Sequence, residues 1–382
     1  MSDKKYFCYE LYKNLAVWSF NGRIGYNPCC FYRGYFETSD TIDIAHAWNS
    51  PTRKELLACA DQDKPVPGCE VCYQAENQGL VSRRQQSFPI YEEFHQDTAI
   101  NLDSPSGLDY SVGNLCNLKC IICNPESSSQ WIPDYQKLYP MADLSALKYQ
   151  KHGQIEVSSN NSLTNIRTLH FHGGGEPLLA QAHKNLLKRV RDVKGLSDVR
   201  IFYNTNGTIC ADNEVLELWE QCKLVELYFS IDDIDHRFDY QRTGFSFAEL
   251  KKNLQWYTEN MPHNHMFKVN AVWGYLNLYY LDELVAWKNA EFTKNRYSDP
   301  TNLIFQEAIG ITNIKHVSLE LKNILLKKFE KYPELIELVN ALTVLNQPHT
   351  EFLDWIARLD SVRNQNFATI APEWLGLLAN TR

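Results

Sequence analysis

The strongest constraint on the fold is an alternation of short apolar runs with longer amphipathic segments, which begins near residue 108. The apolar runs are LDYSV, RTLHF, VRIFY, LVELYFSI, FKVNAVW and LIFQEA, and the segments between them include HKNLLKRVRDV, NEVLELWEQC and SFAELKKNLQWYTEN. The runs have the composition of buried strands, and the longer segments have helical periodicity. Strands that alternate with helices predict an α/β fold with a parallel sheet. Six strands indicate a partial (β/α)6 parallel barrel or an open parallel sheet.

The cysteines divide the chain further. They lie at positions 8, 29, 30, 59, 69 and 72, then at 116, 120 and 123, then at 210 and 222. We therefore predict a small cysteine-rich N-terminal module over 1–95, a barrel over 105–310 and a helical C-terminal extension over 311–382 with three or four helices. In the first part, the strand LAVWSF, an Asn21-Gly22 turn, a second strand and a helix over 51–59 make a small core, which a bound metal centre would stabilise.

Composition excludes several classes of protein. The formal net charge is −8, and no run of five or six basic residues offers a site for a phosphate backbone, so nucleic-acid binding is not expected. The sequence has no signal peptide and no stretch of roughly 18 apolar residues, so we expect no membrane span and a cytoplasmic location. Thiols stay reduced in that compartment, and the grouped spacing of the 11 cysteines indicates metal or cluster ligation.

The segment VGNLCNLKCIIC places Cys116, Cys120 and Cys123 in a C-x3-C-x2-C pattern directly after a predicted strand. Three thiolates at this spacing can hold three corners of a 4Fe-4S cluster and leave one iron open. In the alternative interpretation the three thiolates bind zinc, with a fourth ligand such as His170 or His172.

This pattern resembles the signature of radical S-adenosylmethionine enzymes. The resemblance implies that the amino and carboxylate groups of S-adenosylmethionine chelate the open iron. Electron transfer from the cluster then cleaves the cofactor to a 5′-deoxyadenosyl radical, which takes a hydrogen atom from the substrate. It also implies an electron donor of the flavodoxin or ferredoxin type.

Further segments are similar to those of the family and follow successive predicted strands. They are GGGEP at 173–177, NTNG at 204–207, SIDD at 230–233 and QRTG at 241–244. Glycines suit a turn in which the backbone approaches a ligand closely or takes a positive φ. Taken singly, each segment is also explained as an ordinary turn or helix cap. The resemblance implies cofactor or substrate contacts at Gly174, Gly175, Glu176, Pro177, Asn204, Asn206, Ser230, Asp232 and Arg242. Because parallel strands end at one rim, these groups are expected to meet there.

The N-terminal cysteines are similar to those of the twitch and SPASM modules of the same superfamily, which carry auxiliary 4Fe-4S clusters. The resemblance implies one auxiliary cluster held by Cys8, by Cys29 or Cys30, and by Cys69 and Cys72. Here the module precedes the cysteine triplet, whereas the better-known arrangement places it at the C-terminus. A structural zinc site is the alternative, because a C-x2-C pair with two distant thiols also suits zinc.

Other residues in these regions have simpler interpretations. We interpret Cys59, Cys210 and Cys222 as small buried residues. The segment SRRQQ at 82–86 is interpreted mainly as a solvated face, with a helix that orients substrate as the second hypothesis.

The resemblance favours a peptide or protein side chain as the substrate, since relatives with such modules commonly modify peptides. A sugar, nucleoside or lipid substrate is the alternative within the family. Two further alternatives are an enzyme of this fold that uses S-adenosylmethionine to transfer a methyl or aminocarboxypropyl group without a free radical product, and a non-catalytic zinc-binding interaction protein.

Overall fold

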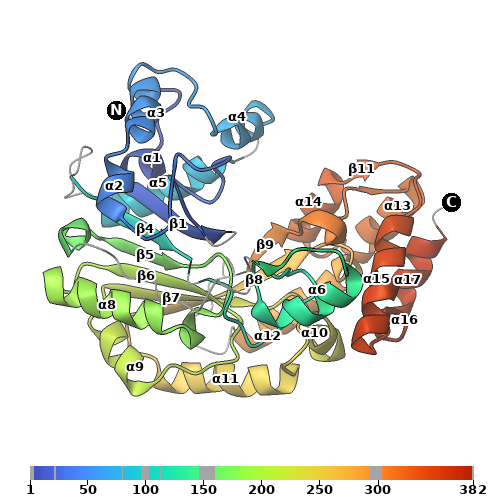
Figure 1. Ribbon diagram of the computed structural model, residues 1–382. Coiled ribbons are helices and arrows are strands. Elements are labelled where there is room, and N and C mark those ends of the chain that lie inside the picture. The colour runs from blue at the N-terminus through green and yellow to red at the C-terminus, as the bar shows by residue number, and fades with distance from the viewer. Residues whose placement is uncertain are drawn as a thin grey trace.

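A nine-stranded sheet organises the molecule, in the strand order β3-β2-β1-β4-β5-β6-β7-β8-β9 (Figure 1). The computed structural model describes residues 4–20, 23–79, 81–95, 103–111, 113–145, 160–292 and 303–380. The strands are β1 (Asn14–Phe20), β2 (Arg23–Asn27), β3 (Glu37–Ser39), β4 (Gly107–Tyr110), β5 (Thr168–Phe171), β6 (Arg200–Thr205), β7 (Leu224–Ser230), β8 (His265–Trp273) and β9 (Leu303–Glu307).

Strands β4 to β9 form the predicted six-stranded parallel part of the sheet, and each pairs with the next in chain order. The α/β class and the partial barrel are thereby confirmed. Each strand falls on its predicted apolar run, because β-branched and aromatic residues favour a pleated, buried backbone.

Three N-terminal strands extend this sheet beyond the six that the sequence indicated. The predicted Asn21-Gly22 turn lies outside the described residues. The strands β1 and β2 pair antiparallel, and β3 pairs antiparallel with β2. In addition, β1 pairs in parallel with β4, from Asn14 opposite Gly107 to Val17 opposite Tyr110. The first 95 residues are thus joined to the barrel by backbone hydrogen bonds, which occupy an edge of β4 that would otherwise be unpaired.

Helices α8 (Gln181–Lys194), α9 (Asn213–Glu220) and α11 (Phe247–Asn260) cover one face of the sheet. Aromatic side chains of the strands pack on them: the ring of Tyr203 contacts Trp219 of α9, and the ring of Phe229 contacts Tyr257 of α11. Successive side chains of a strand alternate between the two faces. The neighbouring residues, such as Phe202 of β6, therefore point to the opposite face, which we call the inner face.

Five helices surround the N-terminal strands: α1 (Tyr9–Lys13), α2 (Ile44–Trp48), α3 (Pro51–Asp61), α4 (Glu70–Asn77) and α5 (Arg83–Phe94). The interpretation of SRRQQ as a solvated face was wrong. Arg83 lies 3.0 Å from the buried carboxylate of Glu10, and Arg84 forms an ion pair with Glu76 and donates to the carbonyl oxygen of Phe7. Both arginines thus tie α5 to the rest of the N-terminal region.

The C-terminal region contains five described helices where the sequence indicated three or four: α13 (Leu319–Lys328), α14 (Pro333–Ala341), α15 (Thr350–Arg363), α16 (Phe367–Ile370) and α17 (Pro372–Ala379). Two short parallel strands, β10 (His316–Val317) and β11 (Thr343–Val344), also lie there. The expected helical extension is therefore present. The sequence predicted too few helices because α16 is a single turn of 4 residues. None of the helices in the described ranges has the length and apolar character needed to span a bilayer.

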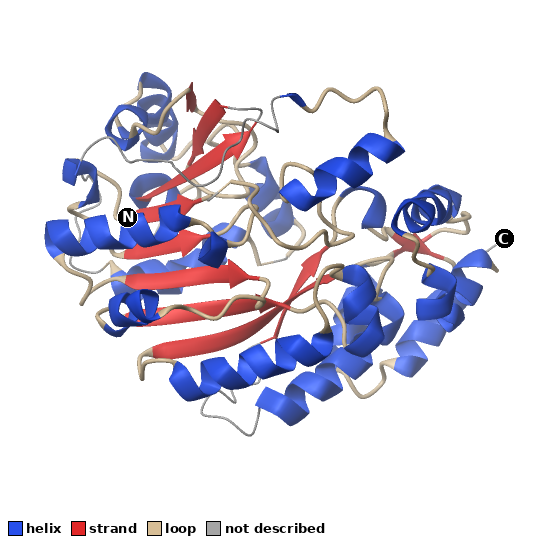
Figure 2. Cartoon of the chain, turned by 60° about the horizontal axis from the view of Figure 1, so that its bottom comes forward, coloured by secondary structure: helices blue, strands red, loops and turns tan. Residues whose placement is uncertain are grey.

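Helix α15 packs against α6 (Ile132–Leu138), which follows the cysteine triplet in the chain (Figure 1). Figure 2 shows helices gathered near the C-terminus, to one side of the sheet. Arg363 donates to the carboxylate of Asp134 at 2.9 Å, and Arg358 donates to the carbonyl oxygen of Leu138 at 2.8 Å. The C-terminal helices therefore lie beside the loop that carries the triplet. The remaining helices are α10 (Asp235–Gln241) and α12 (Leu281–Phe292).

Candidate active site

The triplet lies in a loop that leaves β4 and is held by backbone hydrogen bonds to the end of α10 and to the residues that follow it. The N–H of Lys119 donates to the carbonyl oxygen of Thr243, and the N–H of Ile121 donates to that of Gln241. The indole N–H of Trp131 donates to the carbonyl oxygen of Cys120 at 2.6 Å. These bonds fix the loop at the carboxyl edge of the sheet.

Polar groups point at two of the sulfurs. The backbone N–H of Leu118 lies 3.4 Å from Sγ of Cys116, and the side-chain amide of Asn206 lies 3.7 Å from the same atom. The guanidinium of Arg242 lies 3.7 Å from Sγ of Cys120. Donors of this kind stabilise thiolates and tune the clusters that thiolates hold.

The three thiols differ in their tendency to ionise. Burial raises the pKa of Cys116 to about 11. The adjacent thiol of Cys123 lowers the pKa of Cys120 to about 7, and the charge of Arg242 acts in the same direction. Since a thiolate is the form that binds metal, the positive charge of Arg242 beside Cys120 favours the ligating form of this thiol.

The GGGEP turn follows β5 and packs directly on the cysteine loop. Gly174 and Gly175 have φ values of +111° and +68°, so the positive φ expected at the turn is found. A Cβ on Gly175 would lie 2.8 Å from the carbonyl oxygen of Gly113 and 2.9 Å from that of Leu115. Glycine is needed here because a side chain would collide with the backbone of the loop. Pro177 begins the short helical turn Pro177–Leu179 that follows.

Glu176 turns its side chain into the protein toward the end of β6. Its carboxylate accepts hydrogen bonds from the hydroxyl of Thr205 at 2.9 Å, from the N–H of Asn206 at 2.7 Å and from the N–H of Leu178 at 3.2 Å. Burial raises its pKa to about 7, although these three donors act against that shift. The carboxylate therefore links the GGGEP turn to the NTNG segment.

The remaining predicted residues lie at the ends of β6 and β7. The side-chain oxygen of Asn204 is buried and makes no hydrogen bond, and Ser230 is half-buried opposite Asn270 of β8. Asp232 is buried, accepts from the N–H of Val272 at 2.8 Å and lies 2.7 Å from the guanidinium of Arg242. Hydrogen bonds and ion pairs thus connect the cysteine loop to the ends of the next three strands.

The N-terminal cysteines form a second group. Four of them line one pocket below α4: Cys8, Cys29, Cys69 and Cys72. Cys30 is exposed and does not line this pocket. Tyrosines 6, 32 and 73 line it as well, and Cys69 and Cys72 lie at the start of α4. Of the other cysteines, Cys222 is buried as expected, whereas Cys59 and Cys210 are only half-buried.

The two histidines that were considered as zinc ligands beside the triplet face another residue. Nδ1 of His170 lies 3.5 Å from one carboxylate oxygen of Asp109, and Nε2 of His172 lies 3.6 Å from the other. Asp109 was not among the predicted site residues. Its signal in the sequence was a charged residue inside an otherwise apolar strand, and its partners follow from the strand register, in which Asp109 lies opposite His170.

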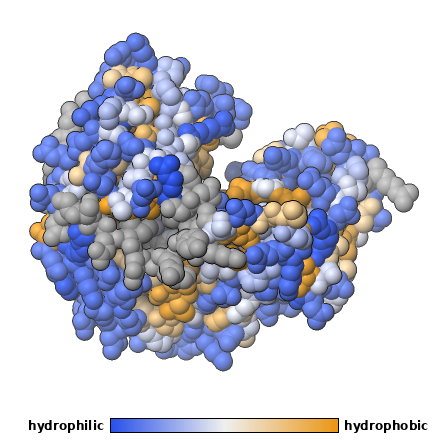
Figure 3. Space-filling model, in the orientation of Figure 1, coloured by the Kyte–Doolittle hydropathy of each residue, from blue (hydrophilic) through white to orange (hydrophobic). Residues whose placement is uncertain are grey.

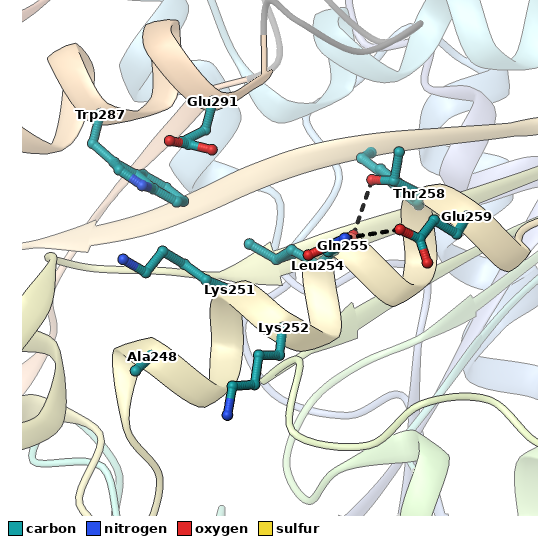
Figure 4. A pocket seen from close by; sticks show the side chains of 10 residues that line it. Ala248, Lys251, Lys252, Leu254, Gln255, Thr258, Glu259, Trp287 and Glu291 are labelled. Atoms are coloured by element: carbon teal, nitrogen blue, oxygen red, sulfur yellow. Dashed lines mark hydrogen bonds between the residues drawn. The ribbon is translucent and has the colours of Figure 1, made fainter.

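A separate large pocket lies on the outer side of the sheet, between α11 and α12 (Figure 4). Lys251, Gln255, Trp287 and Glu291 are among its lining residues, and it includes neither a cysteine nor a predicted cofactor residue. On another side of the molecule, the surface is hollowed between the N-terminal unit and the C-terminal helices (Figure 3).

Comparison with known proteins identifies the domain that carries this site. Residues 110–273 match the family model described as the Radical SAM superfamily. This part of the chain is therefore a radical SAM domain, and the members of that superfamily are enzymes. The matched range contains the cysteine triplet, the GGGEP turn, NTNG, SIDD and QRTG. Membership implies a 4Fe-4S cluster and S-adenosylmethionine as cofactors.

Curated relatives of this radical SAM protein include GTP 3′,8-cyclases. That of Alkaliphilus metalliredigens is 22% identical over 146 residues, which cover 38% of this chain and 41% of the relative. GTP 3′,8-cyclase 1 of Mycobacterium tuberculosis is 32% identical over 109 residues, which cover 28% of this chain and 26% of the relative. The chain thus spans less than half the length of these two relatives.

Solved structures of low similarity include Streptococcus suis SuiB bound to S-adenosylmethionine and native anSMEcpe with bound AdoMet. The first has a TM-score of 0.36 and 15% identity, and the match covers 69% of this chain and 51% of SuiB. The second has a TM-score of 0.37 and 15% identity, and the match covers 62% of each chain.

Proposed function

We propose that Cys116, Cys120 and Cys123 bind the catalytic 4Fe-4S cluster, and that the enzyme uses it to generate a radical that abstracts hydrogen from a peptide or protein side chain. The bound cluster and S-adenosylmethionine would supply the 5′-deoxyadenosyl radical, with electrons from a flavodoxin- or ferredoxin-type donor. The observation that carries the proposal is the convergence of the GGGEP turn, Asn206 and Arg242 on the loop of the three cysteines.

The chain's own residues would hold and shield the reacting groups. The GGGEP turn would offer its backbone to the cofactor, because its glycines leave no side chain between the two. Arg242 would balance negative charge at the cluster while it is anchored by Asp232 at 2.7 Å. Asn204 and Ser230 would contact cofactor or substrate from the neighbouring strand ends. Rigid positioning of this kind is what the reaction requires, since a misplaced radical attacks the protein itself.

The charges at the inner face favour a peptide over a nucleotide. Arg200 lies 2.7 Å from Glu226, Arg242 lies 2.7 Å from Asp232, and Lys268 donates to the hydroxyl of Tyr228. The two arginines are already paired with carboxylates, whereas a triphosphate requires cations that are available for charge-assisted hydrogen bonds. The hollow between the N-terminal unit and the C-terminal helices could admit an extended chain (Figure 3).

The test uses anaerobically reconstituted protein, S-adenosylmethionine and a reductant. We expect formation of 5′-deoxyadenosine, its loss in Cys120→Ala, and its retention in the control Cys222→Ala, which removes a buried thiol outside both cysteine groups. Incubation with candidate peptides and with GTP then separates the substrate classes. Turnover of GTP or another metabolite alone would contradict the peptide assignment. Colourless protein with stoichiometric zinc, or release of a different nucleoside, would contradict the radical mechanism.

We further propose that Cys8, Cys29, Cys69 and Cys72 hold one auxiliary 4Fe-4S cluster, in a twitch-like module over 1–95. Their shared pocket supports this ligand set over one that includes the exposed Cys30. Neighbouring cysteines provide a matched pair of variants. Cys29→Ser should lose about four irons per chain, the content of one 4Fe-4S cluster, whereas Cys30→Ser should keep them. Equal iron content in the two variants would contradict this assignment.

A further inference from the structure

We infer that Asp109, His170 and His172 form a binding site for a divalent transition-metal ion, separate from both cysteine groups. The three side chains are buried, and one ligand atom from each lies within 4.8 Å of the other two. The proposal concerns metal binding alone and does not depend on radical chemistry at the cysteine triplet.

Strand register brings the three residues together. Asp109 of β4 lies directly opposite His170 of β5, and His172 follows two residues later. Residues two apart on a strand point to the same face, so both imidazoles reach the same side of Asp109. Their rings are stacked with centroids 3.9 Å apart, and Trp18 packs edge-on against His172. The three ligands are therefore presented from β4, from β5 and from the residue that directly follows β5.

The contact distances fit an ion better than they fit hydrogen bonds. The nitrogen-to-oxygen distances are 3.5 Å and 3.6 Å. Hydrogen bonds between these groups would be about 2.7 to 3.2 Å long. The two distances run to different oxygens of the carboxylate, so an ion would be held by both oxygens, or by one oxygen after a small rotation of the carboxylate. For comparison, ligand atoms about 2.1 Å from a tetrahedral zinc ion lie about 3.4 Å apart.

Three of the four ring nitrogens of the histidines also lack a hydrogen-bond partner. Both nitrogens of His170 and Nε2 of His172 are buried and make no hydrogen bond. The two residues are only 8% and 7% exposed. A buried polar atom without a partner costs roughly 1–3 kcal/mol. Coordination of a metal would satisfy one nitrogen of each ring at the point where both rings meet the carboxylate.

The ligand set indicates the kind of ion and a role for it. Two imidazoles and one carboxylate suit borderline ions such as Zn²⁺ or Fe²⁺ over Mg²⁺ or Ca²⁺, which prefer oxygen ligands. Three protein ligands leave a coordination position open, as in catalytic metal sites. His172 directly precedes the GGGEP turn, so the open position would present a Lewis acid to a substrate oxygen on the inner face, near the cofactor turn.

The test measures zinc uptake by the full chain after anaerobic reconstitution, when iron fills the thiolate sites. We expect wild-type protein to retain about one Zn²⁺ per chain above its iron after desalting, as a three-ligand site should. Asp109→Asn and His172→Asn should bind zinc at least about tenfold more weakly. His183→Asn is the control, because it removes another buried imidazole, one that contacts the carbonyl oxygen of Ala180. It should keep the zinc.

Iron content and thermal melting show whether each variant is folded. Anomalous scattering at the zinc edge from wild-type crystals locates the bound zinc independently of the variants, and we expect a peak between the three side chains. The inference is overturned if wild-type protein retains no zinc above its iron, if Asp109→Asn binds zinc as well as wild type, or if the zinc peak lies only at cysteines. If wild-type protein retains no zinc, the three side chains would instead serve as polar contacts for substrate.

Discussion

Replacement of Gly175 by alanine should destabilise the protein through two separable costs. Its φ of +68° places it in the left-handed region, where a Cβ costs about 1–2 kcal/mol. The added Cβ would also lie 2.8 Å and 2.9 Å from two backbone oxygens of the cysteine loop, at Gly113 and Leu115. These atoms cannot rotate away, so overpacking adds about 1–3 kcal/mol. We expect a total loss of about 2–5 kcal/mol in the free energy of unfolding.

Gly310 provides a matched control, because its φ is +63° and an added Cβ would meet no atom within 4 Å. Gly310→Ala should therefore lower the free energy of unfolding only by the backbone contribution of about 1–2 kcal/mol. Urea denaturation of both variants, compared with wild type, measures the difference. Because Gly175 packs on the loop of the triplet, only Gly175→Ala should also lower iron content and S-adenosylmethionine affinity. Equal destabilisation of the two variants would refute the argument that contact with the loop requires glycine.

Three further predictions concern buried charges. Burial raises the pKa of Asp233 to about 7, although the ion pair with Arg237 acts against that shift. The native state then keeps a proton that the unfolded chain loses near pH 4, so stability should fall as the pH rises from about 4 to 7, and Asp233→Asn should flatten this dependence of Tm. Arg242→Met should lower the free energy of unfolding, measured by urea denaturation, by about 3–5 kcal/mol, because it leaves the buried carboxylate of Asp232 without its cationic partner. The double variant with Asp232→Asn should recover part of that loss. Thr205→Val should lower the free energy of unfolding by about 1–3 kcal/mol and raise the pKa of Glu176 further, because the carboxylate loses a hydrogen-bond donor. The change is measured as a shift in the pH dependence of Tm, and an unchanged dependence would show that the hydroxyl is not a significant donor.

The sequence predicted the local elements well because their signals are local. All six parallel strands fall on the predicted apolar runs, and α8, α9 and α11 fall on the predicted helical segments. The positive φ of the GGGEP turn followed from its glycines, and the C-x3-C-x2-C spacing needed no fold to indicate a cluster. The order of motifs after successive strands was enough to predict that they meet at one rim, and hydrogen bonds from Asn206 and Arg242 reach the sulfurs of Cys116 and Cys120.

Relations between distant segments were decided only by the tertiary structure. Spacing could not choose between Cys29 and Cys30, because which of two adjacent thiols faces inward depends on the chain direction after β2. Periodicity likewise gave no indication that β1 pairs with β4, or that Arg83 meets Glu10. Asp109 and His170 are 61 positions apart in the chain, and the register of β4 against β5 brings them together. Local sequence specifies how a segment folds, whereas the partners of a buried charge are set by long-range backbone pairing.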